Sequence, residues 1–168
     1  MQSARIYKIA VIGPKGSGKS RFLQRCRQNL HAFDSRNGTV PIPLHLTAEG
    51  HWVNFCVVPS DQYHNPNCWQ YAGADGIIAV YSAESDFEET KEHMKEFCAL
   101  SIFPVLVNAE VVVLLTQMDV SNAQYARDRV VPLAFARFCM HFVSSQTGDG
   151  VAFAVESLVG RIVRRVAA

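Results

Sequence analysis

The stretch IYKIAVIGPKGSGKS, residues 6–20, decides how the rest of the chain is interpreted. Ile6–Ile12 is a short apolar run typical of a buried strand, and Lys19–Leu30 has the periodicity of an amphipathic helix. The segment between them, from Gly13 to Ser20, matches the pattern Gly-x-x-x-x-Gly-Lys-Ser/Thr. A glycine-rich loop of this pattern between a strand and a helix predicts a phosphate-binding loop.

The residue types of this loop suit an anion. Gly13, Gly16 and Gly18 let the backbone turn tightly and point its N–H groups inward at the positive end of the helix. Lys19 is expected to reach the β and γ phosphates of a nucleoside triphosphate, and the Ser20 hydroxyl to ligate a bridging magnesium ion. The other predicted nucleotide contacts in this segment are Pro14, Lys15, Ser17 and Arg21. The alternative is a structural turn with a solvated Lys19, although a cation in the first turn opposes the helix dipole.

Short apolar runs alternate with amphipathic stretches along the rest of the chain. Strands are predicted at Val53–Val58, Gly76–Tyr81, Val111–Leu115 and Met140–Val143, and helices at Asp86–Leu100 and Gly150–Val166. The stretch His31–Gly50 is rich in turn formers and predicts a long loop followed by an edge hairpin. This alternation predicts one α/β domain over residues 1–168, a mostly parallel six-stranded sheet flanked by about five helices.

Two helix faces and two helix boundaries can be predicted in more detail. The apolar stripe of Asp86–Leu100 comprises Phe87, Met94, Phe97 and Cys98, and that of Gly150–Val166 comprises Val151, Phe153, Val155, Leu158, Ile162 and Val163. Ser85 and Glu88 form a capping-box pattern. Pro132 suits the first turn of a short helix that ends near Phe138.

Composition excludes several classes of function. With a net charge of +1 and 18% charged residues, the chain lacks the basic surface that nucleic-acid binding needs. Its five cysteines form no Cys-x-x-Cys pair, so neither a disulfide framework nor a zinc site is predicted. The first residues lack a signal-peptide pattern, Gln2 stands where myristoylation requires glycine, and the last residues lack a prenylation cysteine. We therefore expect a cytoplasmic protein without a direct membrane anchor.

Two further motifs follow the strands Val111–Leu115 and Met140–Val143, namely Thr116-Gln117-Met118-Asp119 and Ser144-Ser145-Gln146-Thr147-Gly148. These two motifs come after the predicted phosphate loop in the same order as in the small GTPases of the Ras and Rab type. They resemble the Asn/Thr-Lys-x-Asp and Ser-Ala-Lys motifs of that family. The resemblance covers nearly the whole chain and implies a P-loop small-GTPase fold that binds GTP or GDP with Mg²⁺.

In that resemblance, Asp119 would accept hydrogen bonds from guanine N1 and N2, and the Ser145 N–H would donate to O6. A carboxylate would meet only acceptors on the ring edge of adenine, which favours guanine. The remaining predicted residues around the base are Thr116, Gln117, Ser144 and Gln146. As an isolated residue, Asp119 has the alternative of a helix cap or an Asx-turn.

The chain departs from the family pattern at several positions. Gln117 and Gln146 stand where the family has lysines, which predicts weaker binding. After Val58 the family places Asp-x-x-Gly-Gln, whereas this chain reads Pro59-Ser60-Asp61-Gln62-Tyr63. In an ungapped alignment Tyr63 takes the place of the glutamine that positions the attacking water, so intrinsic hydrolysis is expected to be weak or absent unless Asp61 or Gln62 substitutes through a shifted loop.

Thr39 is the candidate for the threonine that contacts magnesium and γ-phosphate in the first switch, with an ordinary loop threonine as the alternative. The arginines of the first predicted helix, Arg21, Arg25 and Arg27, are interpreted as a solvated face and not as catalytic arginines.

The segments Asn67-Cys68-Trp69 and Ala74–Tyr81 resemble those of the Rab-like small GTPases of intraflagellar transport complexes. That resemblance implies a GTP-loaded subunit docked on coiled-coil transport proteins, in the cytoplasm and in the cilium or flagellum and its base. The alternative for Trp69 is that it packs under the second switch. Two other functions stay open, a P-loop nucleoside or nucleotide kinase, for which no arginine-bearing lid is evident, and a nucleotide-free pseudo-GTPase scaffold.

Overall fold

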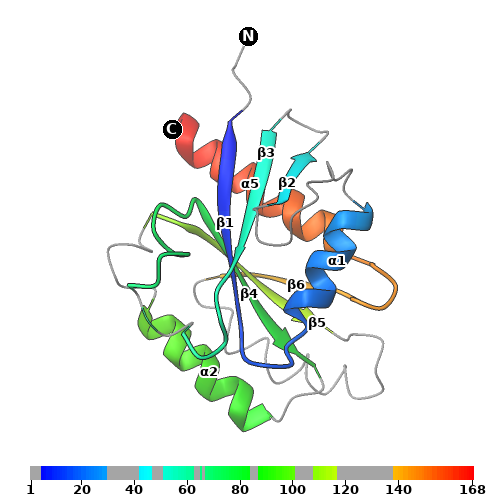
Figure 1. Cartoon of the computed structure of the whole chain (residues 1–168), viewed down its shortest axis with the longest axis vertical. Coiled ribbons are helices and arrows are strands. Elements are labelled where there is room, and N and C mark those ends of the chain that lie inside the picture. Colours follow the sequence, from blue (N-terminus) through cyan, green and yellow to red (C-terminus); the bar gives the residue numbers. More distant parts are fainter. Residues whose placement is uncertain are drawn as a thin grey trace.

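One mostly parallel sheet organises the molecule (Figure 1). The computed structural model describes residues 5–29, 42–46, 51–62, 65, 67–83, 87–100, 108–116 and 138–168. Within these residues six strands lie in the order β2-β3-β1-β4-β5-β6, with β2 antiparallel to β3 and all other neighbours parallel. The strands are β1 (Ile6–Ile12), β2 (Ile42–Leu46), β3 (His51–Val57), β4 (Gly76–Ser82), β5 (Glu110–Thr116) and β6 (Cys139–Phe142).

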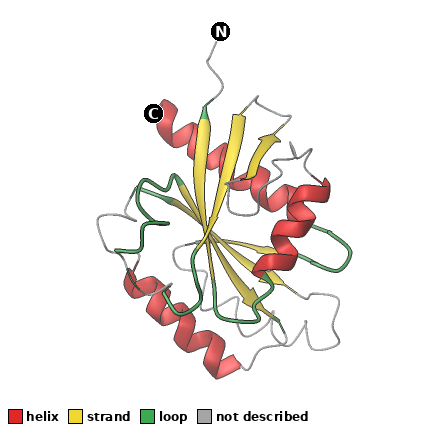
Figure 2. Ribbon diagram, in the orientation of Figure 1, coloured by secondary structure: helices red, strands yellow, loops and turns green. Residues whose placement is uncertain are grey.

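Three helices lie within the described residues, α1 (Lys19–Asn29), α2 (Phe87–Leu100) and α5 (Val151–Ala167) (Figure 2). The predicted α/β class, the six strands and the edge hairpin formed by β2 and β3 are confirmed. Each predicted strand and each of the three predicted helices agrees with the observed element to within two residues at either end. The proposed capping residue Ser85 and the short helix from Pro132 lie outside the described residues.

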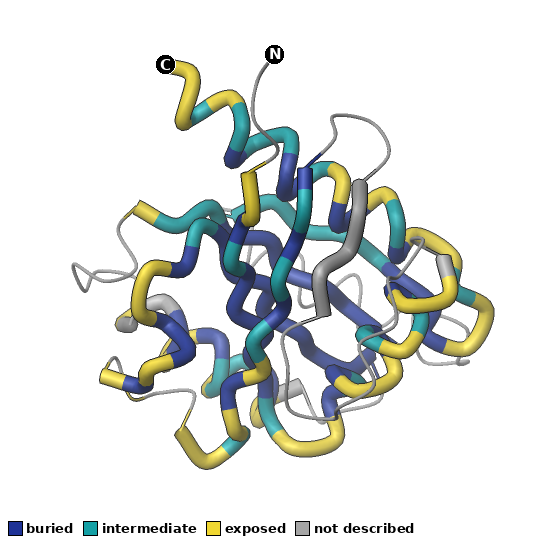
Figure 3. The backbone as a smooth tube through the Cα atoms, turned by 45° about the horizontal axis from the view of Figure 1, so that its top comes forward, coloured by how far each residue is buried: buried dark blue, intermediate teal, exposed yellow. Residues whose placement is uncertain are grey.

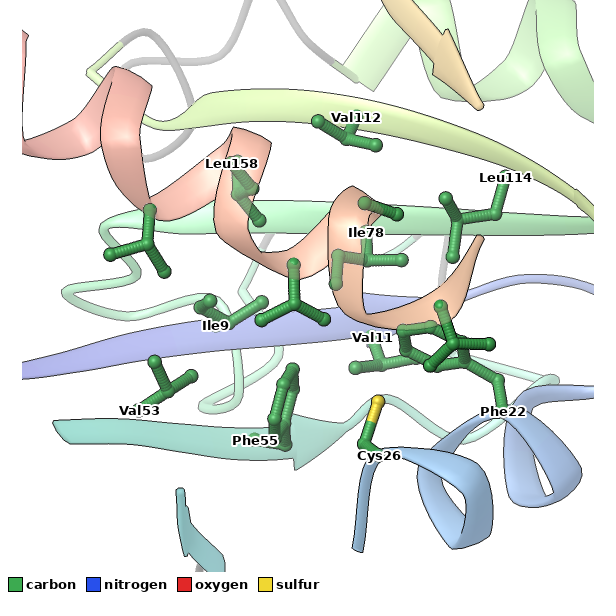
Figure 4. Close-up of a cluster of buried hydrophobic side chains, with 14 of the residues drawn as sticks. Ile9, Val11, Phe22, Cys26, Val53, Phe55, Ile78, Val112, Leu114 and Leu158 are labelled. Atoms are coloured by element: carbon green, nitrogen blue, oxygen red, sulfur yellow. The ribbon is translucent and has the colours of Figure 1, made fainter. Parts of the chain in front are cut away.

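The helices cover the two faces of the sheet and create two cores. Because side chains alternate across a strand, Ala10 and Ile12 of β1 face α2, where they join Met94 and Phe97. The other side of β1 faces α1 and α5 in a cluster that includes Ile9, Val11, Phe22, Cys26 and Leu158 (Figure 4). β4 lies between the two cores, and all seven of its residues are buried (Figure 3).

The face of α5 that packs on the sheet agrees with the prediction at Val151, Val155, Leu158 and Ile162, and differs from it at Phe153, Ala154, Val159 and the partly buried Val163. The buried residues are Val151, Ala154, Val155, Leu158, Val159 and Ile162, a stripe of three- and four-residue spacing. Phe153 lies off this stripe and is 65% exposed, its ring edge-on to His141 at 5.4 Å. Its assignment to the buried face was therefore wrong, because the small residue Ala154 occupies the contact instead.

The alternative given for Trp69, packing under the second switch, does not fit the structure, because Trp69 is 69% exposed. Its neighbours Cys68, Gln70 and Tyr71 are buried. The ammonium group of Lys8 lies 5.7 Å from the centre of the Trp69 ring and donates to the carbonyl oxygens of Trp69 and Ala72, at 3.2 and 2.6 Å. The segment is therefore attached to β1 through its backbone, which leaves the indole at the surface.

The parallel order places the carboxyl ends of β1, β3, β4, β5 and β6 at one edge of the sheet. Loops that leave this edge are the usual ligand sites of open α/β sheets. Three described segments start there: the Gly13–Gly18 turn after β1, the Pro59–Gln62 turn after β3 and the Ser144–Gly150 loop after β6.

Candidate functional site

The segment Gly13–Gly18 joins β1 to α1 through a tight turn that only glycine permits at its first position. A methyl group added to Gly13, where φ is 148°, would lie 2.2 Å from the carbonyl oxygen of Val80 in β4. The turn is closed by the N–H of Ser17, which donates to the carbonyl oxygen of Pro14 at 3.2 Å. The loop is therefore held against the end of β4 at the carboxyl edge of the sheet.

Lys19 is folded into this loop. Its side chain is only 9% exposed, and its ammonium nitrogen Nζ donates to the carbonyl oxygens of Gly13 and Pro14 at 2.6 and 2.9 Å. A third donation goes to the Ser60 hydroxyl at 3.0 Å. The alternative of a solvated lysine is therefore wrong.

Burial lowers the pKa of Lys19, because removal from water disfavours the charged form. Within the described part of the chain no carboxylate forms an ion pair with it. A buried ammonium group with only neutral oxygen partners attracts an anion.

Other loop residues differ in exposure. Lys15, Gly16 and Ser20 are exposed, so the Ser20 hydroxyl at the start of α1 is accessible to a metal ion. Ser17 is 1% exposed, and its hydroxyl oxygen has no hydrogen-bond partner among the described residues. It would lie 2.8 Å from a methyl group on Gly13, so it is packed inside the turn.

The structure brings Thr116, the last residue of β5, into contact with the phosphate-loop segment. Its hydroxyl oxygen Oγ1 lies 2.7 Å from the carbonyl oxygen of Ser17 and 3.2 Å from that of Tyr81. Because Thr116 begins the Thr-Gln-x-Asp motif, that motif starts next to the phosphate loop. Gln117 and Asp119 lie outside the described residues.

The Ser144–Gly148 motif forms a closed loop after β6. The N–H of Thr147 donates to the Ser144 hydroxyl at 3.1 Å, and the N–H of Gly148 donates to the Ser144 carbonyl at 2.8 Å. Ser145 is buried, and its hydroxyl oxygen has no partner within the described residues. The loop is therefore closed by its own backbone bonds.

A cavity of about 390 Å³ lies between this loop and α1. Its lining residues are Arg21, Gln24, Arg25, Gln28, Ser145 and Gln146. The cavity thus joins the predicted base-binding residues Ser145 and Gln146 to the helix that begins with Lys19.

The interpretation of the three arginines as a solvated face holds for Arg21 and Arg27, which are exposed, and is wrong for Arg25. Arg25 donates through Nε to the carbonyl oxygen of Ser145 at 3.0 Å and through Nη2 to that of Gln146. The helix pattern alone hides this contact, because the carbonyl acceptors are 120 positions away in sequence. One feature of the sequence could have indicated this contact, namely the row of polar residues along one side of α1, formed by Arg21, Gln24, Arg25 and Gln28.

The turn after β3 contributes Ser60 and neither of the two residues considered as substitutes. The N–H of Gln62 donates to the carbonyl oxygen of Pro59 at 2.9 Å, which closes the turn and places Ser60 beside Lys19. The side chains of Asp61 and Gln62 are exposed. Sequence reasoning missed Ser60, although β3 is the neighbour of β1, so the residues that follow the two strands must lie close together.

The predicted metal ligand Thr39 lies outside the described residues, as does Tyr63, which aligns with the glutamine that positions water in the small GTPases that the sequence resembles. In the described ranges no group of three or more His, Cys, Asp or Glu side chains could hold a metal ion. None of the helices described is long and apolar enough to cross a bilayer.

No protein-family model matches this chain, and no curated protein matches it either. The proposal for the function below therefore rests on the chemistry of the site.

Proposed function

We propose that this protein is a small-GTPase-like domain that binds GTP or GDP with Mg²⁺. The observation that carries the proposal is the buried ammonium group of Lys19, held inside a glycine turn at the start of α1 by neutral oxygens alone. Backbone N–H groups at a helix start and a desolvated lysine are together a site for phosphate oxygens. Ser20, exposed at the same helix start, is the proposed magnesium ligand.

Recognition of guanine is assigned to the loops after β5 and β6. Two contacts support this assignment: Thr116, the last residue of β5, touches Ser17 of the Gly13–Gly18 turn, and Ser145 lines the cavity beside α1. Asp119 would accept from guanine N1 and N2, and the backbone N–H of Ser145 would donate to O6. This two-point pattern is the basis for preferring GTP to ATP.

Little or no intrinsic hydrolysis is proposed, because residues 59–62, the described part of the turn after β3, offer no side chain suited to orient water. Gln62 is exposed, and its side-chain oxygen accepts a weak hydrogen bond from the sulfur of Cys68 at 3.8 Å. Ser60, the residue that reaches Lys19, has neither the carboxamide nor the charge that the family uses.

We propose that the domain acts by binding a protein partner, a coiled-coil subunit of intraflagellar transport in the cilium or flagellum. The turn containing Ser60 touches the phosphate-binding lysine, so a bound γ-phosphate would alter that contact and with it the adjoining surface. Purification of GTP- and GDP-loaded chain with coiled-coil transport subunits tests this directly, with stronger co-purification of the GTP form expected.

A nucleotide-free pseudo-GTPase scaffold is the second candidate, and one observation favours it. All three protons of the Lys19 ammonium group have oxygen acceptors from the protein itself, so the site is internally satisfied. A ligand must therefore displace at least the Ser60 hydroxyl.

The deciding experiment is to purify the protein without added nucleotide, denature it and identify what is released by chromatography. The refolded or untreated protein is then incubated with GTP and Mg²⁺, and phosphate release is followed, with Lys19→Met as the control that cannot bind. Bound guanine nucleotide that survives for hours supports the proposal. Release of adenine nucleotide contradicts the guanine assignment, and failure to take up GTP at high concentration favours the scaffold.

A further inference from the structure

One side chain connects the helix of the phosphate site to the loop after β6. Arg25 in the second turn of α1 donates to the backbone carbonyls of Ser145 and Gln146, and its remaining nitrogen Nη1 donates to the side-chain oxygen of Gln28 at 2.9 Å. Arg25 is half-buried, and it belongs to the wall of the α1 cavity. Each end of its guanidinium group therefore has an acceptor.

We infer that Arg25 is a positioning residue, which fixes the base-recognition loop relative to the phosphate loop. The inference rests on the proposed function, because it assigns Ser145 to guanine and Lys19 to phosphate. Both Lys19 and Arg25 lie on α1, about one and a half turns apart. A shift of α1 would therefore reach the backbone of Ser145 through the planar guanidinium group of Arg25.

The choice of arginine follows from the geometry of the acceptors. The carbonyl oxygens of two successive residues accept from Nε and Nη2 of one guanidinium group, whose planar frame holds its donors in a fixed fork. A lysine ammonium at the same place would be a point donor without that fixed orientation. The contact therefore restrains orientation as well as distance.

Two other sets of backbone contacts in the described part of the loop have different roles. The contacts of Ser144 with Thr147 and Gly148 are internal to the loop, so they shape it without fixing it against α1. The N–H of Val143 donates to the Leu115 carbonyl at 3.0 Å, which anchors only the start of the loop to β5. Loss of the arginine should leave the loop closed but movable with respect to Lys19.

The first test compares GTP with inorganic triphosphate as ligands of the full chain. Arg25→Ala should weaken GTP binding about tenfold or more, and should leave triphosphate binding unchanged, since Lys19 is untouched. It should also lower the preference for GTP over ATP. Arg25→Lys should fall between Arg25→Ala and the wild type, and Arg27→Ala, exposed on the same helix, should match the wild type.

The second test needs no nucleotide and measures backbone hydrogen exchange of residues 144–149. Exchange should become faster in Arg25→Ala and stay unchanged in Arg27→Ala, with the strands of the sheet protected equally in all variants. Unchanged exchange in Arg25→Ala overturns the inference.

The outcomes separate this inference from the proposed function. If the wild type binds triphosphate but not GTP, the guanine assignment and the inference both fail. If the wild type binds GTP and Arg25→Ala loses nothing, or loses equal factors for GTP and triphosphate, only the inference fails.

Discussion

The hydroxyl oxygen of Thr116 lies 2.7 Å from the carbonyl oxygen of Ser17, which connects the end of β5 to the middle of the phosphate-loop segment across 99 positions of sequence. Both residues are almost fully buried. The contact thus joins the first residue of the predicted base motif to the predicted phosphate site, and no water competes for it.

Replacement of Thr116 by valine tests this contact, because valine keeps the shape and removes the hydroxyl. We expect a loss of about 1–3 kcal/mol in the free energy of unfolding, since the Ser17 carbonyl is left buried without this donor. Thr116→Ser keeps the hydroxyl and should lose only the contribution of one methyl group, about 1 kcal/mol. Urea unfolding measures both, and a valine variant no less stable than the serine variant would mean that the bond contributes little.

Two glycines of the loop should respond very differently to alanine. At Gly13 the added methyl group meets the backbone oxygen of Val80 at 2.2 Å, so Gly13→Ala should destabilise the protein by at least about 3 kcal/mol. A methyl group added to Gly16 would have no other described atom within 4 Å outside its chain neighbours. Gly16→Ala should therefore cost only the strain of a φ of 79°, about 1–2 kcal/mol. Similar melting temperatures for the two variants would contradict the close contact with β4.

Lys19→Met should weaken binding of inorganic triphosphate about 100-fold, the effect of about 3 kcal/mol expected for a charge-assisted contact. Lys15→Met is the matched control, because Lys15 is exposed in the same loop. It should lose less than Lys19→Met. Equal losses would indicate general charge attraction and no specific role of the buried ammonium group.

The lowered pKa of Lys19 predicts a pH dependence of stability with a definite sign. As pH rises from the lowered pKa of the folded state toward the ordinary value of 10.5, the folded protein has lost this proton while the unfolded chain still binds it. The unfolded state then binds more protons, so this group makes stability increase with pH in that window. Subtracting the Lys19→Met profile from the wild-type profile should isolate the increase, and a difference of opposite slope would show that the folded state favours the charged lysine.

The stripe on α5 gives a pair of contrasting core substitutions. Leu158→Ala should cost about 2–5 kcal/mol, because Leu158 is fully buried between α5 and the sheet. Phe153→Ser should cost less than about 1 kcal/mol, because most of the Phe153 side chain is already in water. Chemical denaturation of the two variants checks this, and a large loss for Phe153→Ser would place its ring in a contact that its exposure hides.

Much of the sheet could be predicted from sequence because its strands are buried. β4 is apolar at nearly every position because both of its faces are covered, and the end of β1 and the start of α1 are marked by the glycine loop between them. Burial of individual aromatic residues could not be predicted in the same way. Phe153 and Trp69 are apolar and yet exposed. The residue type alone does not indicate which side of the local backbone meets the core.

The candidate site was predictable where one continuous segment forms it and not where distant segments meet. Residues 13–20 could be recognised from their own spacing. The contact of Ser60 with Lys19 joins residues 41 positions apart, and that of Arg25 with Ser145 joins residues 120 apart. Both contacts depend on the strand order, which places the ends of β3 and β6 on either side of the start of α1. A single sequence does not specify which distant residues are paired in this way.

The exposed indole of Trp69 gives the protein its own optical probe. The chain contains two tryptophans, and Trp52 lies within β3 while Trp69 follows the turn that carries Ser60. The emission of Trp69 therefore reports on water and on the nearby Lys8 ammonium group, and that of Trp52 serves as an internal reference. A ligand that breaks the contact between Lys19 and Ser60 should change the conformation of the segment leading to Trp69. Ligand binding can then be followed over time by tryptophan fluorescence without an added label.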